Sequence, residues 1–415
     1  MSTLISHPTS NQFNRALVYT LNSRQKLLGF YTAVAFFFKN YKKKSSIHFL
    51  NELKRRSFRR SIFTVTKTKP FRELGRLICI KLNLRIFISH EKGFFSIDKV
   101  YENHDRWVAS KLKKEKLKGL KSIYAYEDGA LESFIKAKNL GINCLYELPI
   151  GYWRSAQGFI QKEMKMNPEW STTLTLLKDS DRKLRRKDNE LALSDTIFVA
   201  SSFTRDTLRE YPGKLPPIKV IPYGFPEVNN QKRYIPLINR KLKLLFVGSL
   251  SQRKGLSYLF ESIKGLEQEV VLTLIGKKGS TDCPPLNLNI NQHRWIPSLS
   301  HQEVLSEMRS HDLLLFPSLF EGFGLVITEA MSQGTPVITT ERTAGPDIIT
   351  HGVDGWLVNA GSSKSIREVL EEILESPSLI QRIGLAAQKR AKLRPWSLYG
   401  TEVLEIIEKL ERKNN

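Results

Sequence analysis

Short aliphatic and β-branched runs alternate with longer segments of helical periodicity along most of this chain. Such alternation is typical of α/β proteins, in which helices connect the strands of a parallel sheet. In the first half, the predicted strands are Ala16–Leu21, Ser122–Tyr126, Ile142–Tyr146, Thr196–Ala200 and Lys219–Ile221. Predicted helices lie at Leu131–Asn139 and Thr204–Glu210. The polar stretch Ile160–Leu191 is also compatible with helix, and its basic run Arg182–Lys187 is expected to be a solvated helix face.

A cluster of prolines and a glycine, Pro222–Pro226, opens a polar stretch that continues to Arg240. This pattern is typical of a hinge or linker between domains. After it, the predicted strands are Lys243–Val247, Val270–Ile275, Leu313–Phe316 and Pro336–Thr339. The predicted helices are Leu256–Ile263, Gln302–Arg309, Leu325–Ser332, Ser365–Leu374, Pro377–Ala391 and Leu398–Glu411. We therefore expect two α/β units that divide near residue 230.

The charge of the chain is distributed unevenly between these two halves. The 415 residues carry a formal net charge of +24. Residues 1–230 hold 42 basic and 21 acidic side chains, whereas residues 231–415 hold 23 and 20. The first half is thus expected to meet an anionic partner, such as a membrane surface, a nucleic acid or a phosphorylated acceptor. With 41% hydrophobic residues the chain can bury full cores, which excludes wholesale disorder.

The three cysteines, Cys79, Cys144 and Cys283, have the spacing of neither a metal site nor a disulfide framework. We therefore expect a reducing, cytoplasmic setting. The N-terminus lacks the pattern of a secretory signal. The most apolar stretch, Leu27–Phe38, has about 12 residues, and spanning a bilayer takes roughly 20.

That apolar stretch has two interpretations. It is either the first core helix of its domain or an amphipathic helix that lies on an anionic membrane, backed by Lys39 and the run Lys42–Lys44. No recognisable nucleic-acid-binding module accompanies the charge, so no nucleic-acid partner is expected. The sequence therefore predicts a peripheral protein at the inner face of the membrane.

The most informative segment is Phe316–Ala330, which has the sequence FPSLFEGFGLVITEA. A buried strand ends at Phe316, a turn with two glycines follows, and a helix begins near Leu325. In a parallel sheet such turns lie at the edge where ligands bind. The free amides at the start of that helix favour an anion, and Glu329 lies one turn further on the same face. Together with Glu321 on the turn, this pattern predicts a site for a sugar attached to a phosphate.

A second strand, turn and helix support this interpretation. The sequence LFVGSLSQRKG, residues 245–255, places Arg253 and Lys254 at the same edge of the sheet. Two cations there could neutralise a diphosphate.

These motifs resemble those of the family 4 retaining glycosyltransferases. The spacing of Glu321 and Glu329 in FEGFGLVITEA is similar to the family's EX7E segment, and VGSLSQRKG is similar to its diphosphate-binding loop. The segments IPYGF (221–225), TIFVASSFTR (196–205) and ITHGVDGWLV (349–358), and the late Trp396, fit as well. The resemblance is close over roughly 195–412 and looser over 120–195.

The resemblance implies a GT-B fold, in which two Rossmann-like domains face each other across a cleft. The implied domains are residues 1–225 on the acceptor side, residues 226–395 for the nucleotide sugar, and a helix at 396–415 that crosses back. Glu321 and Lys254 would act in catalysis. The implied donor-binding residues are Ser249, Arg253, Lys254, Trp295, Ile296, Glu321, Gly322, Phe323, Gly324, Leu325 and Glu329. The donor would be a UDP- or GDP-sugar, with no cofactor and no obligatory metal.

The acceptor side departs from the family pattern. The loop Asn22–Lys26 lacks the glycine pair often found there, and Ser249 stands where many relatives have an arginine. No counterpart of the N-domain histidine of some relatives is evident. The substitutes at apparent strand ends are Glu127, Asp128 and Glu147, with the pair His104–Asp105 as a further candidate.

Two other motifs have simpler explanations. Asp179-Ser180-Asp181 has the form of a metal-binding DxD but lies in a charged, helix-compatible stretch, so solvated charges are expected. In Gly276–Thr281 the lysines precede the second glycine, which does not fit a P-loop.

The main hypothesis is a retaining hexosyltransferase that moves a sugar from a nucleotide to a glycan or lipid-linked acceptor in surface polysaccharide or glycolipid synthesis. The alternatives are a nucleotide-sugar epimerase of the same architecture and a non-catalytic protein that binds anionic surfaces.

Overall fold

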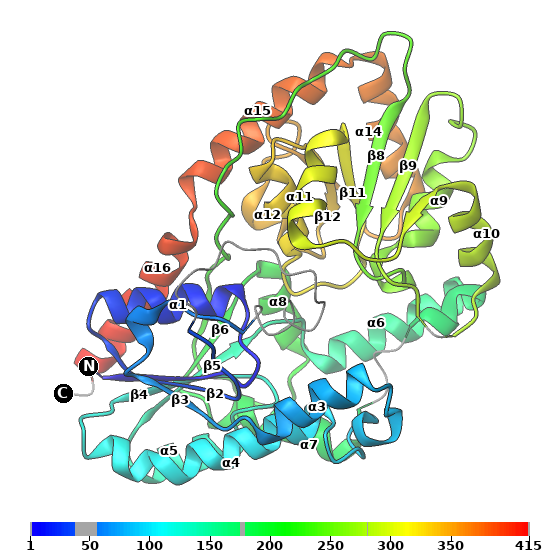
Figure 1. Cartoon of the computed structure of the whole chain (residues 1–415). Helices are drawn as coiled ribbons and strands as arrows, with labels where there is room; N and C mark the ends of the chain where they lie inside the picture. The colour runs from blue at the N-terminus through cyan, green and yellow to red at the C-terminus, as the bar shows by residue number, and fades with distance from the viewer. Residues whose placement is uncertain (1, 38–55, 175–178, 280, 414–415) are drawn as a thin grey trace.

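The computed structural model describes residues 2–37, 56–174, 179–279 and 281–413. Within these residues the chain forms two α/β units, each built around one parallel sheet (Figure 1). Helices cover both faces of each sheet, as expected where strands are joined by crossover helices. The structure confirms the predicted α/β class with two Rossmann-like units.

The described strands of the first sheet follow the order β3-β2-β1-β4-β5-β6-β7. Their bounds are β1 Thr3–Ser6, β2 Leu27–Thr32, β3 Thr66–Thr68, β4 Ser122–Tyr126, β5 Asn143–Leu148, β6 Thr196–Val199 and β7 Ile218–Val220. Every residue of the central strands β1 and β4 is buried. Strands covered on both faces are apolar along their whole length, which is why the sequence of β4 shows no alternation.

The helices of the first unit are α1 Gln12–Ser23, α3 Phe71–Lys81, α4 Ile97–Lys116, α5 Leu131–Asn139, α6 Trp153–Met166, α7 Asp181–Leu193 and α8 Ser202–Thr207. Short 3-10 turns lie at η1 Arg60–Ile62, η2 Arg85–Ile88, η3 Pro168–Thr173 and η4 Leu208–Glu210. Side-chain caps fix several of the starts. The Ser96 side chain accepts from the amide of Lys99 at the start of α4, and Ser180 accepts from that of Lys183 at the start of α7.

The second sheet has the described order β10-β9-β8-β11-β12-β13. Its strands are β8 Leu242–Val247, β9 Val270–Ile275, β10 Arg294–Ile296, β11 Leu313–Phe316, β12 Val337–Thr340 and β13 Trp356–Val358. Around it lie η5 Gln252–Lys254, α9 Leu256–Ile263, α10 Pro284–Gln292, α11 His301–Ser310, α12 Leu325–Ser332, α13 Gly345–Ile348, α14 Ser363–Glu375 and α15 Ser378–Leu393.

The last helix, α16 (Trp396–Lys413), leaves the second unit and packs against α1 of the first (Figure 1). The ion pair Lys26–Glu408, at 2.9 Å, ties it to the end of α1. The segment around Gly224, which leads to the second unit, lies directly beside the segment around Trp396, which returns from it. A Cβ on Gly224 would lie 2.4 Å from the Cα of Trp396. The exact domain limits at 225/226 and 395/396 stay a prediction.

Two sequence-based predictions near the N-terminus are wrong. Ala16–Leu21 lies inside helix α1, whose start is fixed by the Asn11 side chain accepting from the amide of Asn14. The apolar stretch that begins at Leu27 is not a helix, because β2 is a strand paired with β1 and β3 inside the sheet. Both helical interpretations of that stretch fail, and Lys39 and Lys42–Lys44 lie outside the described residues.

The expected solvated face of α7 is also wrong for three of the five basic residues in this run. Lys183, Arg186 and Lys187 are mostly buried in ion pairs with carboxylates of the first unit. Only Arg182 and Arg185 are exposed in this run. Among the described helices, none is long and apolar enough to cross a membrane.

Candidate active site

The loop after β11, residues 317–324, is pressed against the first unit. A Cβ on Gly322 would lie 1.9 Å from the carbonyl oxygen of Pro149, in the loop after β5. A Cβ on Gly151 would meet the ring of Phe320 at 2.4 Å. Both loops follow the carboxyl ends of parallel strands, where ligands bind in α/β proteins. The ligand edges of the two sheets therefore meet at this junction.

Glu321 lies at the centre of a charged cluster on the β11 loop. Its Oε2 accepts from Lys254 Nζ, from Arg253 Nη1 at 3.1 Å and from Ser318 Oγ at 3.3 Å. Arg253 also donates to the carbonyl of Phe320 at 2.7 Å, which binds η5 to the loop. The Glu321 and Lys254 side chains are 15% and 10% exposed, so the charges interact largely out of water.

The electrostatics of this cluster keep Glu321 ionised. Burial by itself would raise the pKa of Glu321, but the charges of Lys254 and Arg253 outweigh it and the net shift is downward. Burial is also the largest effect on Lys254, whose pKa is lowered despite the opposing attraction of Glu321. An anionic ligand at this position could compete with Glu321 for the two cations.

Glycines give the loop its shape. Gly255 has φ 73°, and a Cβ there would lie 2.0 Å from the carbonyl oxygen of Pro317, so only glycine lets η5 approach the β11 loop. Gly324 has φ 88° and begins α12 without a side-chain cap. The first amides of α12, at Leu325 and Val326, therefore have no side-chain cap and form a potential anion site.

Two hydroxyls of the first unit hold the loop from the other side. Ser201 Oγ and Thr204 Oγ1 donate to the carbonyl oxygen of Gly322 at 2.6 and 3.0 Å. Phe323 is buried beside them and packs on Tyr223 of the hinge segment, with ring centroids 4.9 Å apart. The loop is therefore positioned jointly by both units.

Glu329 lies on α12, behind the turn. Burial raises its pKa to about 7. The Nδ1 atom of His301 is 3.7 Å from its Oε1, and no hydrogen bond to the Glu329 carboxylate occurs in the described part of the chain beyond this long ion pair. A buried carboxylate with so few partners has free acceptor capacity for hydroxyl groups of a ligand.

A cavity of about 390 Å³ opens beside the charged cluster. Its lining includes Ser249, Arg253, Lys277 and Lys278, together with Thr173 from the first unit. Three cations around one cavity suit an anionic ligand such as a diphosphate. The two lysines belong to the glycine-rich segment that does not fit a P-loop, and sequence reasoning missed them as candidate ligands.

Trp295 and Ile296 lie on β10, the edge strand beside β9. The indole Nε1 of Trp295 donates to the carbonyl oxygen of Gly276 at 3.0 Å, and the Ile296 carbonyl accepts from the Gly276 amide at 3.0 Å. Both residues thus hold the β9 loop and do not line the cavity beside Arg253.

On the first unit, a cavity of about 320 Å³ lies at the carboxyl ends of β1, β4 and β5. Its lining includes Glu127 and Asp128, as well as His7, Tyr101 and Tyr126. Burial raises the pKa of Glu127, although Lys187 lies 3.3 Å away. Two of the three acceptor-side carboxylates named from sequence therefore share one cavity.

His7 is the residue that sequence reasoning missed. It directly follows β1, and its Nδ1 accepts from the amides of Thr9 and Ser10 at 3.3 and 2.8 Å. Burial lowers its pKa to about 3, so the ring is neutral at physiological pH. The signal was the short run TLIS before it, which the misplaced strand at Ala16–Leu21 concealed.

The third carboxylate, Glu147, lies elsewhere. It is 1% exposed and accepts from the hydroxyls of Tyr124, Tyr223 and Tyr399 at 2.5, 2.5 and 3.2 Å. Burial raises its pKa to about 7. Because it lines none of the described cavities, this geometry favours a structural role. His104 is likewise buried in the core, with Nε2 3.2 Å from Ser6 Oγ.

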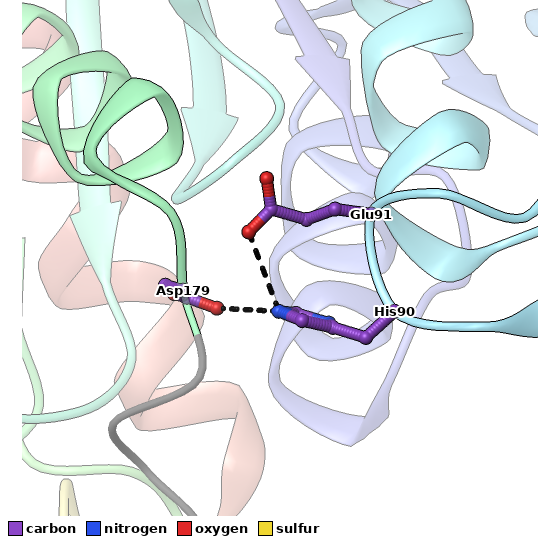
Figure 2. Close-up of side chains that lie close together, drawn as sticks. All are labelled: His90, Glu91 and Asp179. Atoms are coloured by element: carbon purple, nitrogen blue, oxygen red, sulfur yellow. Dashed lines mark ion pairs between the residues drawn. The ribbon is translucent and has the colours of Figure 1, made fainter.

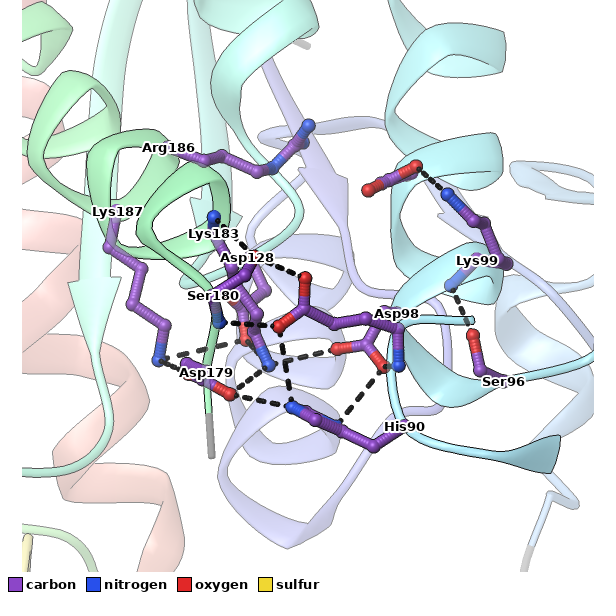
Figure 3. Close-up of polar contacts among 12 residues, drawn as sticks. His90, Ser96, Asp98, Lys99, Asp128, Asp179, Ser180, Lys183, Arg186 and Lys187 are labelled. Atoms are coloured by element: carbon purple, nitrogen blue, oxygen red, sulfur yellow. Dashed lines mark hydrogen bonds and ion pairs between the residues drawn. The ribbon is translucent and has the colours of Figure 1, made fainter. Parts of the chain in front are cut away.

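One group of described side chains has the spacing of a metal site: His90, Glu91 and Asp179 (Figure 2). Asp179 is the first residue of the DxD-like motif, and it already pairs with Lys183 and Lys187 at 3.0 and 3.4 Å (Figure 3). A divalent cation here would lie beside two ammonium groups. The group is therefore better described as part of a charge network that holds the start of α7.

Comparison with known proteins agrees with the donor-side geometry. Residues 228–390 match the family model of the Glycosyl transferases group 1, a stretch that contains the Glu321 cluster, both glycine turns and Glu329. The match covers most of the second unit and less than half of the chain. Glu127, Asp128 and His7 lie outside the match, so the family assignment does not extend to the acceptor side.

Curated relatives are similar to about half of the chain. An MMP alpha-(1->4)-mannosyltransferase of Mycolicibacterium hassiacum is 28% identical over 228 residues, which are 52% of this chain and 54% of that protein. The capsular polysaccharide biosynthesis glycosyltransferase CapM of Staphylococcus aureus is 28% identical over 48% of this chain and 57% of its own length. The chain thus spans little more than half the length of these curated relatives.

The fold extends over the whole chain. The Anabaena protein HepE, solved in complex with UDP, superposes with a TM-score of 0.63 at 16% identity and covers 99% of this chain and 100% of its own. This similarity confirms the GT-B architecture of two facing Rossmann-like domains, including the first unit that the family model does not reach.

Proposed function

We propose that this protein is a retaining glycosyltransferase that moves a hexose from a nucleotide sugar to an acceptor hydroxyl. The observation that carries the proposal is the buried Glu321–Lys254–Arg253 cluster at the ligand edge of a group 1 domain, opposite a second cavity. The structure of HepE in complex with UDP and the mannosyltransferase name of one relative support a nucleotide-sugar donor. The proposed donor is a UDP- or GDP-sugar.

The donor side would act mainly by stabilising the leaving group. Arg253 and Lys254 can bind the diphosphate together with the amides at the start of α12, so that the negative charge that develops on the departing phosphate meets preorganised cations and dipoles. Glu321, freed from those cations by the phosphate, could accept hydroxyls of the sugar, and Glu329 those of the ribose. This arrangement requires no cofactor and no metal in the transfer step.

The acceptor would enter the cavity of the first unit. Its hydroxyl must reach the sugar on the face that the diphosphate leaves, because the configuration is retained. Glu127, Asp128 and the neutral His7 are the polar groups that could orient that hydroxyl. The name of CapM, a capsular polysaccharide biosynthesis glycosyltransferase, supports a glycan acceptor. The proposal extends to lipid-linked acceptors and to use at the inner face of the membrane.

A transfer assay tests the proposal. The chain is incubated with UDP-, GDP-, ADP- and dTDP-hexoses and with lipid-linked and polysaccharide acceptors, and nucleotide release and product are measured. We expect one donor to give a glycoside with the anomeric configuration of the donor, and the Glu329→Ala variant to lose this activity. Conversion of the nucleotide sugar without acceptor would instead identify an epimerase. Absence of nucleotide release with every pair would indicate a non-catalytic binding protein.

A further inference from the structure

Exposed apolar side chains gather in one region of the first unit. Of the 21 large hydrophobic side chains that are exposed among the described residues, ten lie between residues 63 and 97. We name the following eight the α3 face: Phe71, Ile78, Ile80, Leu82, Leu84, Ile86, Phe87 and Phe94. Soluble surfaces rarely concentrate apolar groups in this way without a partner.

Helix α3 has apolar side chains on its exposed side as well as on its buried side. The side of α3 that carries Leu77 and Glu73 is buried against the unit. The opposite side carries Phe71 and Ile78, which are 66% and 49% exposed, and the chain continues into η2, where Ile86 is 84% exposed. The helix therefore has a second apolar side that the fold does not use.

Basic side chains without acidic partners accompany this face. Among the described residues, Lys69, Arg72, Arg106 and Lys111 take part in no ion pair with a carboxylate. Burial first, and then the like charges of Arg106, Arg72 and Lys111, lower the pKa of Lys69. The guanidinium of Arg72 lies 3.8 Å from the ring centroid of Phe94, so charge and apolar surface are in direct contact.

The α3 face continues to the acceptor cavity. Ile97, the first residue of α4, is 39% exposed and follows Phe94 closely in the chain. The same Ile97, together with Asp98, lines the cavity that holds Glu127 and His7. A ligand attached to a lipid could therefore lie with its apolar part on this surface and its polar part in the cavity.

We propose that the α3 face and its cations dock on an anionic lipid bilayer and present the cavity of Glu127 and His7 to lipid-linked acceptors in it. Only the presentation of acceptors to the cavity rests on the proposed glycosyl transfer, because docking itself needs no activity. Anionic bilayers bind proteins that combine two features: apolar side chains that insert among the headgroups, and cations that lie near the lipid phosphates. A second copy of this chain is disfavoured as occupant, because both faces would bring the same unpaired cations together.

Vesicle flotation with the full chain tests the proposal. The vesicles contain phosphatidylcholine alone or phosphatidylcholine mixed with phosphatidylglycerol. We expect binding to the anionic vesicles only, weakened by salt, and reduced roughly tenfold or more in the double variant Leu82→Ser/Ile86→Ser. The matched control Ile235→Ser/Ile238→Ser removes two aliphatic side chains that are 62% and 75% exposed on the connection to the second unit, and should bind like the wild type.

Two further readouts separate this proposal from the proposed function. Calorimetric binding of UDP- and GDP-sugars should be the same in the Leu82→Ser/Ile86→Ser variant and the wild type, whatever the outcome for the vesicles. Equal vesicle binding by the α3-face and control variants, or no binding by the wild type, would overturn the docking proposal while leaving donor binding untouched. A stable dimer that the α3-face variant abolishes in sedimentation would assign the face to a second copy instead.

Discussion

At the residue scale, Glu321 is a carboxylate paired with two cations, Lys254 and Arg253, which are also the proposed ligands of the donor diphosphate. In the absence of a donor, Lys254 and Arg253 hold it ionised although it is mostly buried. A diphosphate would take over those cations and leave Glu321 able to accept hydroxyls of the sugar. The cluster thus offers preformed cations without leaving them unpaired and buried in the free protein, which would cost several kcal/mol.

The first prediction concerns Glu321 itself. Glu321→Gln keeps the size of the side chain but removes the charge and one acceptor. We expect kcat for hexose transfer to fall about 100-fold or more, because the neutral amide stabilises the reacting sugar in the transition state less than the carboxylate does. The control is Glu368→Gln, at an exposed carboxylate of α14. Near-wild-type turnover in Glu321→Gln, with circular dichroism unchanged, contradicts the role proposed for Glu321.

A second prediction follows from the pKa of Glu329, which burial raises to about 7. A protonated carboxyl accepts hydrogen bonds from ribose hydroxyls less well than a carboxylate. Donor affinity is therefore expected to fall as the pH drops through about 7, and this dependence should vanish in Glu329→Gln. Calorimetric titrations at several pH values measure it. If the wild type binds the donor with the same affinity above and below this pKa, Glu329 does not bind the ribose as proposed.

The position of Glu321, Lys254 and Arg253 at one edge of the second sheet could be predicted because strand, glycine turn and helix follow one another directly in the sequence. His7 could not be found in this way, since the strand before it has four residues and the helix after it contains the alternating run Ala16–Leu21. Glu147 was named from its place near a strand end. Its burial among three tyrosines depends on segments far apart in the chain, which no local pattern reveals.

At the scale of elements, the contact between the β11 and β5 loops sets the junction. Gly322→Ala would place a methyl group 1.9 Å from the Pro149 carbonyl before any adjustment, so the loops must move apart. We expect a loss of transfer activity and a lower Tm. Gly158→Ala on α6, where a Cβ meets nothing within 4 Å, is the matched control and should raise stability by about 0.5–1 kcal/mol. Thermal unfolding measures the Tm of both variants. Equal Tm values would mean that the β11 and β5 loops are not in tight contact.

Strands and helices with many buried apolar residues were the easiest to predict. The bounds of β4, β9 and β11 agree with the sequence pattern, as do those of α5, α9 and α12. The basic run of α7 was misjudged because its partners, among them Asp98, Asp105 and Glu127, come from other elements. Charge in a sequence predicts exposure only where no buried carboxylates surround it.

At the scale of the whole molecule, Glu147 joins the first sheet to the two segments that connect the units. Tyr124 belongs to the first sheet, Tyr223 to the hinge segment and Tyr399 to the returning helix α16. One buried carboxylate thus connects the three segments on which the relative position of the units depends.

This arrangement predicts a pH-dependent stability. Burial raises the folded-state pKa of Glu147 from its usual 4.5 to about 7, so its contribution to stability is fully present below 4.5 and lost as the pH rises to about 7. The wild-type free energy of unfolding should therefore fall relative to that of Glu147→Gln by on the order of 3 kcal/mol over this range. Urea denaturation at both ends of the range measures the difference. A constant difference between the two proteins contradicts this account of Glu147.

The central claim for the whole molecule is that the second unit binds the diphosphate of a nucleotide sugar at Lys254 and Arg253, facing an acceptor cavity in the first. The most direct test is calorimetric titration of the wild type and of Lys254→Ala with UDP- and GDP-sugars, with Lys364→Ala, at a lysine 87% exposed, as control. The account predicts that one donor binds the wild type and the control with equal affinity. The same donor should bind Lys254→Ala at least about tenfold more weakly. Equal affinity in all three proteins would contradict it.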